Sequence, residues 1–188
     1  MTVATEKITY QAFREMNFPE DDTAIYELLN GVLVKKSAPS LQHQRAVRNL
    51  FRALDKFVES SKFGEVLFAP MGVKFDDYNV LQPDLFFVSN TRKNILKEEG
   101  GYVDGAPDMI IEVLSPGSIK RDRMEKKSLY AEHGVPEYWI VDPLNRSVEV
   151  YKLVENQYVL DQFVEFEEEI SSSVLPGFKI KLIEIMNA

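Results

Sequence analysis

Apolar residues recur along this chain with two different spacings, and the spacings predict helices and strands in turn. Over residues 40–60, Val47, Leu50, Leu54 and Val58 share one face at helical spacing. Shorter apolar runs between turn residues are typical of strands, and Asn30-Gly31 is a strong hairpin signal. The predicted helices cover 9–16 (with Thr9 as N-cap), 40–60, 119–133 and a short piece within 91–99. The predicted strands cover 25–29, 32–37, 65–69, 72–76, 79–88, 108–114, 137–142, 146–153 and 158–166, and a strand or loop with a short terminal piece is expected over 174–186.

This order of elements predicts an α/β fold in which a mixed central β-sheet is flanked by helices, with a helix and a hairpin at the N-terminus. The length of 188 residues and the absence of repeats or linkers predict a single domain over residues 1–188.

Composition excludes several classes of site and of protein. The chain has no cysteine, which excludes disulfides, thiolate nucleophiles and thiolate metal sites. No apolar run approaches the roughly 20 residues of a membrane span, and the N-terminus has no signal-peptide pattern, so a cytoplasmic protein is expected. The net charge of −8 argues against a protein that coats nucleic acid, although a local basic patch and a bound cation can act in an acidic chain.

Glu112 is an acidic residue inside an otherwise apolar strand, Met109–Leu114. Such a strand is usually covered on both faces, where an ionised carboxylate needs a metal or a cationic partner. Two interpretations remain open, a metal ligand and a structural ion pair with a nearby lysine or arginine.

Asp84 follows Pro83 and opens the apolar run Leu85–Val88. A proline suits the first residue of a strand, which places Asp84 at the rim of the sheet. Two carboxylates from adjacent strands form a natural Mg²⁺ site, because Mg²⁺ prefers oxygen ligands and uses only one or two protein carboxylates. The alternative is an aspartate that stabilises a turn.

Lys126 shares a face of the helix at 119–133 with Asp122, Leu129 and Tyr130. If this face is directed inward, the amine could orient water or hold a phosphate oxygen. The alternative is a lysine whose stem is packed and whose charged head stays in water.

These residues resemble the PD-(D/E)xK nuclease superfamily, with Pro83-Asp84 as the first motif and Glu112 as the acidic strand position. The lysine expected two residues later is replaced by Leu114. A more specific similarity, to the Uma family of restriction endonucleases, runs in order over nearly the whole chain. It is carried by Tyr26–Gly31, Gln82–Asp84, Glu112–Pro116, Asp122–Tyr130 and Gly134–Pro143.

The resemblance implies a restriction-endonuclease-like core and a divalent metal, with Lys126 at the position to which the strand lysine has moved. It also nominates Glu27 as a further metal ligand, for which an ordinary surface glutamate is an equal alternative. His43 matches a family position that could approach substrate, but an ordinary surface or capping histidine is the favoured interpretation.

Two groups of basic residues could contact nucleic acid. Arg45, Arg48, Arg52 and Lys56 line the polar face of the helix at 40–60, where a solvated face is the favoured interpretation. A second group adjoins the expected metal site and could hold phosphates there: Lys120, Arg121, Arg123 and Lys127.

The leading hypothesis is therefore a Mg²⁺-dependent endonuclease (Mn²⁺ as a substitute) that hydrolyses DNA phosphodiester bonds. In this hypothesis Asp84, Glu112 and the Val113 carbonyl hold the metal, and a symmetric homodimer would suit duplex cutting. One alternative is an inactive nuclease-fold module that binds nucleic acid or a protein. Another is a metal-free hydrolase with a carboxylate pair, such as a glycosidase.

Overall fold

The computed structural model describes residues 6–187 apart from residues 20, 23 and 37, and it contains two six-stranded sheets. The first sheet has the order β2-β1-β5-β4-β8-β7 and is antiparallel except between β4 and β8. Its strands are β1 (Tyr26–Leu29), β2 (Val32–Lys35), β4 (Gly72–Asp76), β5 (Asn79–Leu81), β7 (Leu96–Lys97) and β8 (Tyr102–Asp104). The predicted hairpin joins β1 to β2, and Asn30 and Gly31 both have positive φ, as such a tight turn requires.

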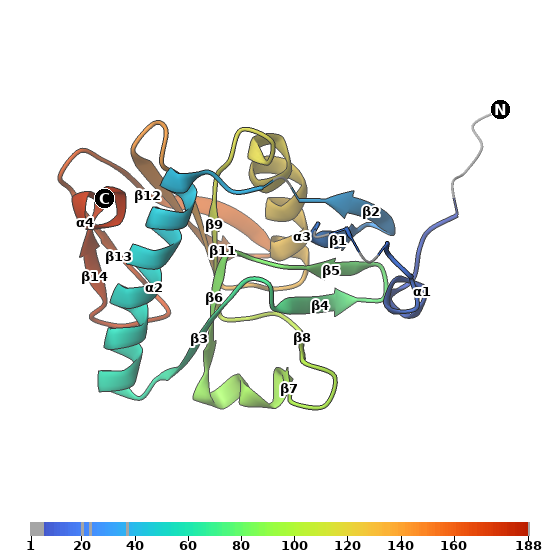
Figure 1. Cartoon of the computed structure of the whole chain (residues 1–188). Coiled ribbons are helices and arrows are strands. Elements are labelled where there is room, and N and C mark those ends of the chain that lie inside the picture. Colours follow the sequence, from blue (N-terminus) through green and yellow to red (C-terminus); the bar gives the residue numbers. More distant parts are fainter. Residues whose placement is uncertain (1–5, 20, 23, 37, 188) are drawn as a thin grey trace.

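The second sheet, of order β12-β11-β10-β9-β6-β3, forms the centre of the molecule (Figure 1). It is antiparallel except between β9 and β10. Its strands are β3 (Gly64–Phe68), β6 (Leu85–Ser89), β9 (Met109–Val113), β10 (Glu137–Asp142), β11 (Ser147–Val154) and β12 (Gln157–Glu165). A two-stranded sheet of β13 (Glu169–Ser171) and β14 (Lys179–Lys181) follows.

The helices are α1 (Tyr10–Arg14), α2 (Leu41–Ser61), the 3₁₀ helix η1 (Asn90–Ile95), the π-helix η2 (Arg121–Lys126), α3 (Lys127–Glu132) and α4 (Leu182–Met186). Helices cover both faces of the second sheet, with α2 and α4 on one side and α3 on the other, whereas α1 lies beside the first sheet (Figure 1). The Thr9 side chain caps α1 and the Ser40 side chain caps α2. Across the described residues, no helix is long and apolar enough to cross a membrane.

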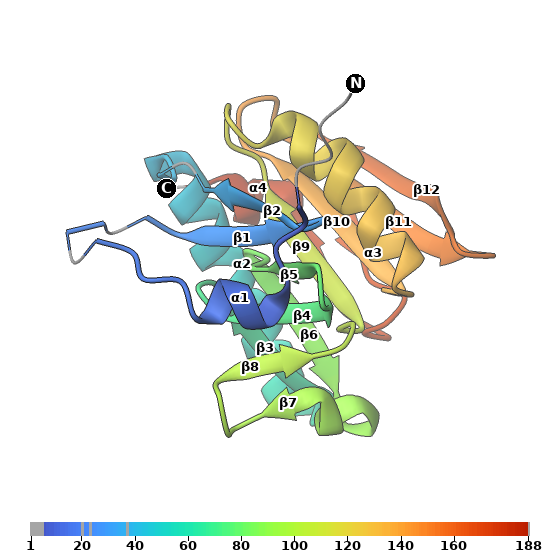
Figure 2. The same cartoon turned by 90° about the vertical axis from the view of Figure 1, so that its right-hand side faces the viewer.

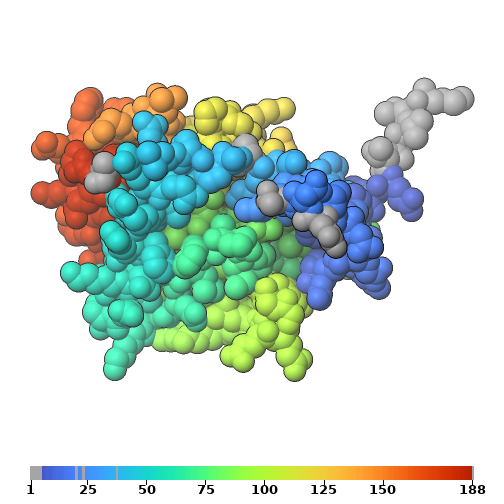
Figure 3. Space-filling view, viewed as in Figure 1, coloured from blue at the N-terminus to red at the C-terminus, as the bar shows by residue number. Residues whose placement is uncertain are grey.

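Two apolar cores lie on opposite sides of the second sheet. In the first, Leu50 and Leu54 of α2 pack against Trp139 and residues of the C-terminal elements. In the second, which includes residues of both large sheets and α3, Phe86 and Tyr130 are fully buried. Figure 2 shows the strands of the first sheet from the front, and in Figure 3 α2 forms a continuous ridge on the surface. Successive apolar residues of β6 and β9 therefore face the two cores in turn.

The structure corrects the strand predicted at 79–88, which is two strands in different sheets. β5 ends at Leu81 and pairs with β1 and β4, whereas β6 begins at Leu85 and pairs with β3 and β9. Pro83 lies between them and has no N–H to donate to a ladder, so it favours the break. Asp84 consequently lies at the junction of the two sheets.

The predicted helix at 119–133 also differs in its geometry. Its first part is the π-helix η2, which changes to α-helical hydrogen bonding at Lys127. Segments of π-helix are rare and occur frequently at functional sites. Both Asp122 and Lys126 of η2 are buried. β7, β8 and β13 were not predicted, while the terminal piece expected near 186 is α4, whose Ile185 is buried.

Candidate functional site

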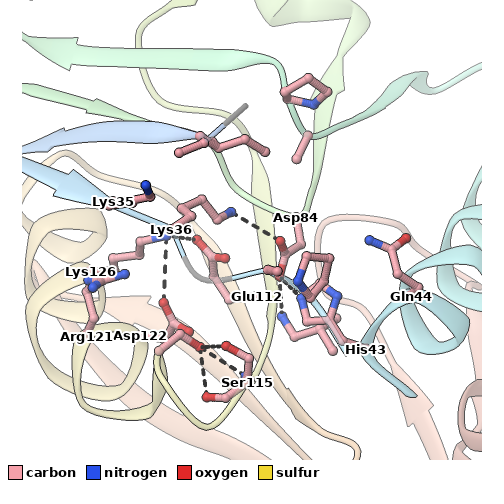
Figure 4. Close-up of a pocket in the computed structure, with 18 of the residues that line it drawn as sticks. Lys35, Lys36, His43, Gln44, Asp84, Glu112, Ser115, Arg121, Asp122 and Lys126 are labelled. Atoms are coloured by element: carbon pink, nitrogen blue, oxygen red, sulfur yellow. Dashed lines mark hydrogen bonds and ion pairs between the residues drawn. The ribbon is translucent and has the colours of Figure 1, made fainter. Parts of the chain in front are cut away.

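Asp84 and Glu112 meet at the edge of the β6–β9 ladder. Leu85 pairs with Ile111, so the next position on each strand brings Asp84 opposite Glu112. Both residues line a pocket of about 500 Å³ whose walls include the start of α2, the segment after β2 and η2 (Figure 4). The predicted convergence of these two carboxylates is therefore present in the structure.

Asp84 is held by three donors. Oδ2 accepts hydrogen bonds from the Val113 backbone N–H at 2.9 Å and pairs with His43 Nε2 at 3.0 Å, while Lys36 Nζ lies 3.3 Å from Oδ1. Burial by itself would raise the pKa of Asp84, but the His43 hydrogen bond and the Lys36 charge hold it well below its ordinary value. Asp84 is thus a fixed, ionised carboxylate.

Glu112 is held through a single oxygen. Oε1 accepts hydrogen bonds from Lys126 Nζ at 2.9 Å and from the Tyr130 hydroxyl at 2.7 Å. Among the described residues no hydrogen bond reaches Oε2. Burial raises the pKa of Glu112 to about 7, against the opposing effect of the Lys126 charge. Glu112 therefore exchanges its proton near neutral pH.

Lys126 lies among three carboxylates. Its Nζ is 2.9 Å from Glu112, 3.0 Å from Glu27 and 3.7 Å from Asp122. Burial alone would lower the pKa of Lys126, but these charges hold it well above its ordinary value. Only 2% of the side chain is exposed, so the alternative of a solvated head is wrong.

Glu27, on β1, is completely buried, so its interpretation as a surface glutamate is also wrong. Its Oε1 accepts hydrogen bonds from the Gln82 backbone N–H at 2.8 Å and from Lys126 Nζ. Glu27 is not among the residues that line the pocket. The structure therefore joins Glu27 to the site through Lys126, and its role as a metal ligand stays a prediction.

His43 was expected to be an ordinary surface or capping residue, and the structure corrects this. The backbone N–H of His43 bonds to the N-cap Ser40, while the ring is only 7% exposed and contacts Asp84. His43 lines the pocket, so it is placed beside any substrate that enters. Helical periodicity carried a signal for this, because His43 shares the buried face of α2 with Leu50 and Leu54.

The second basic group, Lys120, Arg121, Arg123 and Lys127, was expected to hold phosphates at the metal site, but it does not converge on the pocket. Arg121 lines it, but Lys120 is exposed outside it. Arg123 forms ion pairs with Glu149 and Asp142, and Lys127 lies 3.5 Å from the centre of the Tyr151 ring. Because β11 supplies carboxylate and aromatic partners, it holds Arg123 and Lys127 on the sheet. Arg48, Arg52 and Lys56 of α2 are exposed, as the solvated-face interpretation predicts.

Two residues at the site were not predicted from the sequence. Lys36 contacts Asp84 from the end of β2, and Tyr130 contacts Glu112 from α3. Tyr130 lies on the helix face that the sequence predicted to be inward. A signal for Lys36 exists in strand alternation, which puts it on the same side as the half-buried Val34, but two adjacent lysines normally indicate a solvated strand end.

The charges of the site suit a divalent cation. Four buried carboxyl groups (Glu27, Asp84, Glu112 and Asp122) face two ammonium groups (Lys36 and Lys126), which leaves two uncompensated negative charges when all are ionised. Buried Oε2 of Glu27 and Oδ1 of Asp122 have no hydrogen-bond partner among the described residues. Such an excess is costly unless protons or a cation offset it.

Asp84 and Glu112 would provide the ligands for such an ion. The Val113 N–H is directed to Asp84, and a strand residue directs its N–H and C=O to the same side, so the Val113 carbonyl faces the same gap. Over the part of the chain that the structure describes, no three His, Cys, Asp or Glu side chains form a metal cluster. Two carboxylates and a carbonyl oxygen are donors of the kind that Mg²⁺ takes, since this ion uses one or two protein carboxylates and keeps several waters.

Comparison with known proteins identifies the family. The family model Uma2, described as "Putative restriction endonuclease", matches residues 10–183. The chain belongs to the Uma2 family. The resemblance drawn from the sequence motifs is thus confirmed. The matched range includes every residue that lines the pocket. No curated protein matches the chain.

A solved structure confirms the predicted fold class. It is described as a "putative nuclease belonging to DUF820 from Anabaena variabilis ATCC 29413". The two folds superpose with a TM-score of 0.76, over 95% of this chain and 97% of the other, at 19% sequence identity. At this identity the likeness concerns the fold.

Proposed function

We propose that this Uma2 protein is a metal-dependent endonuclease that hydrolyses phosphodiester bonds in DNA, with Mg²⁺ as its cofactor and Mn²⁺ as a substitute. The supporting observation is the pairing of Asp84 with Glu112 at a pocket that three lysines also line: Lys35, Lys36 and Lys126. Family membership supports the same class of reaction.

Each side chain would have a distinct task. The bonds from His43 and Val113 fix the orientation of Asp84, and those from Lys126 and Tyr130 fix Glu112, so both carboxylates are in place before substrate arrives. The bound Mg²⁺ would polarise a phosphate oxygen and lower the pKa of a water molecule.

The reaction is a substitution at phosphorus. The oxygen of the attacking water forms a bond to phosphorus as one P–O ester bond breaks. One water proton leaves the attacking oxygen, and the departing sugar oxygen takes a proton to become a hydroxyl. Each cleavage therefore produces a phosphomonoester end and a hydroxyl end.

The proposed assay is cleavage of supercoiled plasmid DNA in Mg²⁺, Mn²⁺ or EDTA. We expect Asp84→Asn and Glu112→Gln to abolish cleavage, because each removes a charged ligand while preserving the shape of the side chain. The control is Glu169→Gln, which removes a carboxylate that pairs with Lys179 on β14. Cleavage by both site variants at the wild-type rate would exclude this site. Hydrolysis that persists in EDTA would favour a metal-free carboxylate pair.

The duplex substrate also suggests an assembly. A pocket cuts one strand, so a twofold homodimer would place one pocket on each strand of a duplex. Analytical ultracentrifugation with and without duplex DNA tests this, and a monomer that makes only single-strand nicks would contradict it.

One observation favours a non-catalytic nucleic-acid or protein-binding module instead. Both oxygens of Asp84 and Oε1 of Glu112 already contact donors of the protein, which a metal ion would have to share or displace. Calorimetric titration with Mg²⁺ and with Mn²⁺ separates the two functions. An absence of binding by either ion would favour the module.

A further inference from the structure

A nuclease of this kind needs an amine that can reach the scissile phosphate, and two lysines of the pocket, Lys36 and Lys126, contact Asp84 and Glu112. We propose that Lys36 is the amine that contacts the phosphate and that Lys126 is a positioning residue for Glu112 and Glu27. This inference rests on the proposed function and assigns to Lys36 the role that the sequence motifs suggested for Lys126.

The surroundings of Lys126 leave it no freedom to reach substrate. Two of its N–H bonds donate to Glu112 and Glu27 at 2.9 and 3.0 Å, and the Asp122 carboxylate lies 3.7 Å from the amine. Because the side chain is only 2% exposed, movement of the amine toward a phosphate would lengthen these short ion pairs in a buried environment, which leaves a carboxylate uncompensated. In Figure 4 dashed lines join the Lys126 amine to Glu112 and to Asp122.

Lys36 has the opposite character. Its Nζ donates to the Gln82 carbonyl at 2.8 Å and to Asp84 at 3.3 Å, and the Glu27 carboxylate at 4.0 Å is beyond hydrogen-bond distance. Within the described residues its third N–H thus has no acceptor. The side chain is 19% exposed, against 2% for Lys126, and it lines the pocket.

The backbone holds Lys36 in this position. The Lys36 N–H donates to the Ile25 carbonyl at 2.8 Å, which continues the β1–β2 pairing by one residue beyond β2. The neighbouring Lys35 also lines the pocket, but its side chain is 61% exposed and its amine lies 3.7 Å from Asp22 and over the Tyr26 ring. Of these two lysines, only Lys36 contacts Asp84.

The contact with Asp84 gives Lys36 its expected partner in the complex. A cation bound at Asp84 would repel the ammonium group of Lys36. The negative phosphate that this cation holds would lie next to the cation and to the ammonium group. The Lys36–Asp84 distance of 3.3 Å is longer than an ordinary N–H···O bond, so it is readily exchanged. We therefore expect Lys36 to transfer a hydrogen bond from Asp84 to a non-bridging phosphate oxygen, while the Gln82 carbonyl keeps the amine in place.

The test compares three Lys→Met variants for their binding to a fluorescent DNA duplex. Ca²⁺ replaces Mg²⁺, so that binding is measured apart from cleavage. The affinity is followed by anisotropy between about 50 and 200 mM salt, because each phosphate contact contributes roughly −0.9 to the slope of log K against log salt. Lys36→Met should reduce this slope by about 0.9, and its single-turnover cleavage in Mg²⁺ should fall by about 100-fold or more.

The control Lys179→Met removes a surface lysine that also pairs with one carboxylate, and it should leave both slope and rate unchanged. Lys126→Met should keep the wild-type slope. A wild-type slope for Lys36→Met would overturn the inference, and if the wild type still cleaves DNA, the proposed function would stand. Failure of the wild type to bind or cut DNA would refute both.

A measurement on the wild-type protein avoids any dependence on the folding of a variant. The side-chain ¹⁵Nζ signals of Lys36 and Lys126 are followed by NMR as the same duplex is added. A shift of the Lys36 signal with a constant Lys126 signal is expected. A shift of the Lys126 signal alone would overturn the assignment.

Discussion

The buried Glu112 carboxyl should make the stability of this protein decrease as the pH rises from 5 to 8. Burial raises the pKa of Glu112 from an ordinary 4.5 to about 7. A carboxyl with a raised pKa binds its proton more tightly in the folded chain, so its contribution to stability is complete below about pH 4.5 and is lost as the pH rises through about 7. The shift corresponds to about 3 kcal/mol.

Glu112→Gln tests this value, because glutamine has the same shape and its oxygen can still accept from Lys126 and Tyr130. Urea unfolding is followed through the fluorescence of Trp139, which is fully buried and the only tryptophan. In EDTA, the free energy of unfolding of the variant minus that of the wild type should increase by about 3 kcal/mol from pH 5 to pH 8. Taking the difference removes groups that titrate equally in both proteins.

The low pKa of Asp84 does not interfere, because a lowered pKa removes stability only as the pH falls below its ordinary value. A difference between variant and wild type that stays constant from pH 5 to 8 would refute the reasoning, since it would mean that Glu112 is ionised throughout. Repeating the experiment with Mg²⁺ should stabilise the wild type more than the variant if the ion binds at this carboxylate.

Three further changes should alter stability through separate causes. Lys126→Met should lower the free energy of unfolding by about 3–5 kcal/mol at pH 8, since it leaves buried carboxylates uncompensated, whereas Lys179→Met should change it by less than about 0.5 kcal/mol in the same urea titration. Tyr130→Phe should lower the free energy of unfolding by about 1–3 kcal/mol, because it removes a hydrogen-bond donor from the buried Glu112. The variant should also show a higher Glu112 pKa by carboxyl NMR, and an unchanged pKa would contradict the contact. Gly64→Ala should lower the free energy of unfolding by about 1–3 kcal/mol or more, because the added methyl group would overlap a carbonyl oxygen of β6. If the variant unfolds at the same temperature as the wild type, β3 adapts to the methyl group and the prediction is wrong.

Sequence patterns predicted most elements because those elements depend on local chemistry. The face of α2, the Asn30-Gly31 turn and the apolar run of β9 are each visible within a short window, and the structure has all three. The same logic failed at 79–88, where the break at Pro83 assigns two neighbouring strands to different sheets. Nothing local indicates which partner a strand edge will choose.

The two carboxylates of the candidate site were equally visible, because an acidic residue in an apolar strand is rare unless something compensates its charge. Asp84 and Glu112 could therefore be identified before their contacts were known. Lys36 could not, since it occupies a position where a solvated side chain is the ordinary outcome. For His43 the resemblance offered a role at the substrate, but only the packing of α2 shows that its ring contacts Asp84.

The sequence by itself determined the family, the α/β class and the two acidic residues at the centre of the pocket, because motifs and periodicity are properties of order along the chain. Only the tertiary structure decided which amine is enclosed and which reaches the pocket. Burial and ion pairing depend on distances between residues far apart in the sequence, such as the 3.0 Å between Lys126 and Glu27, and no local pattern encodes them.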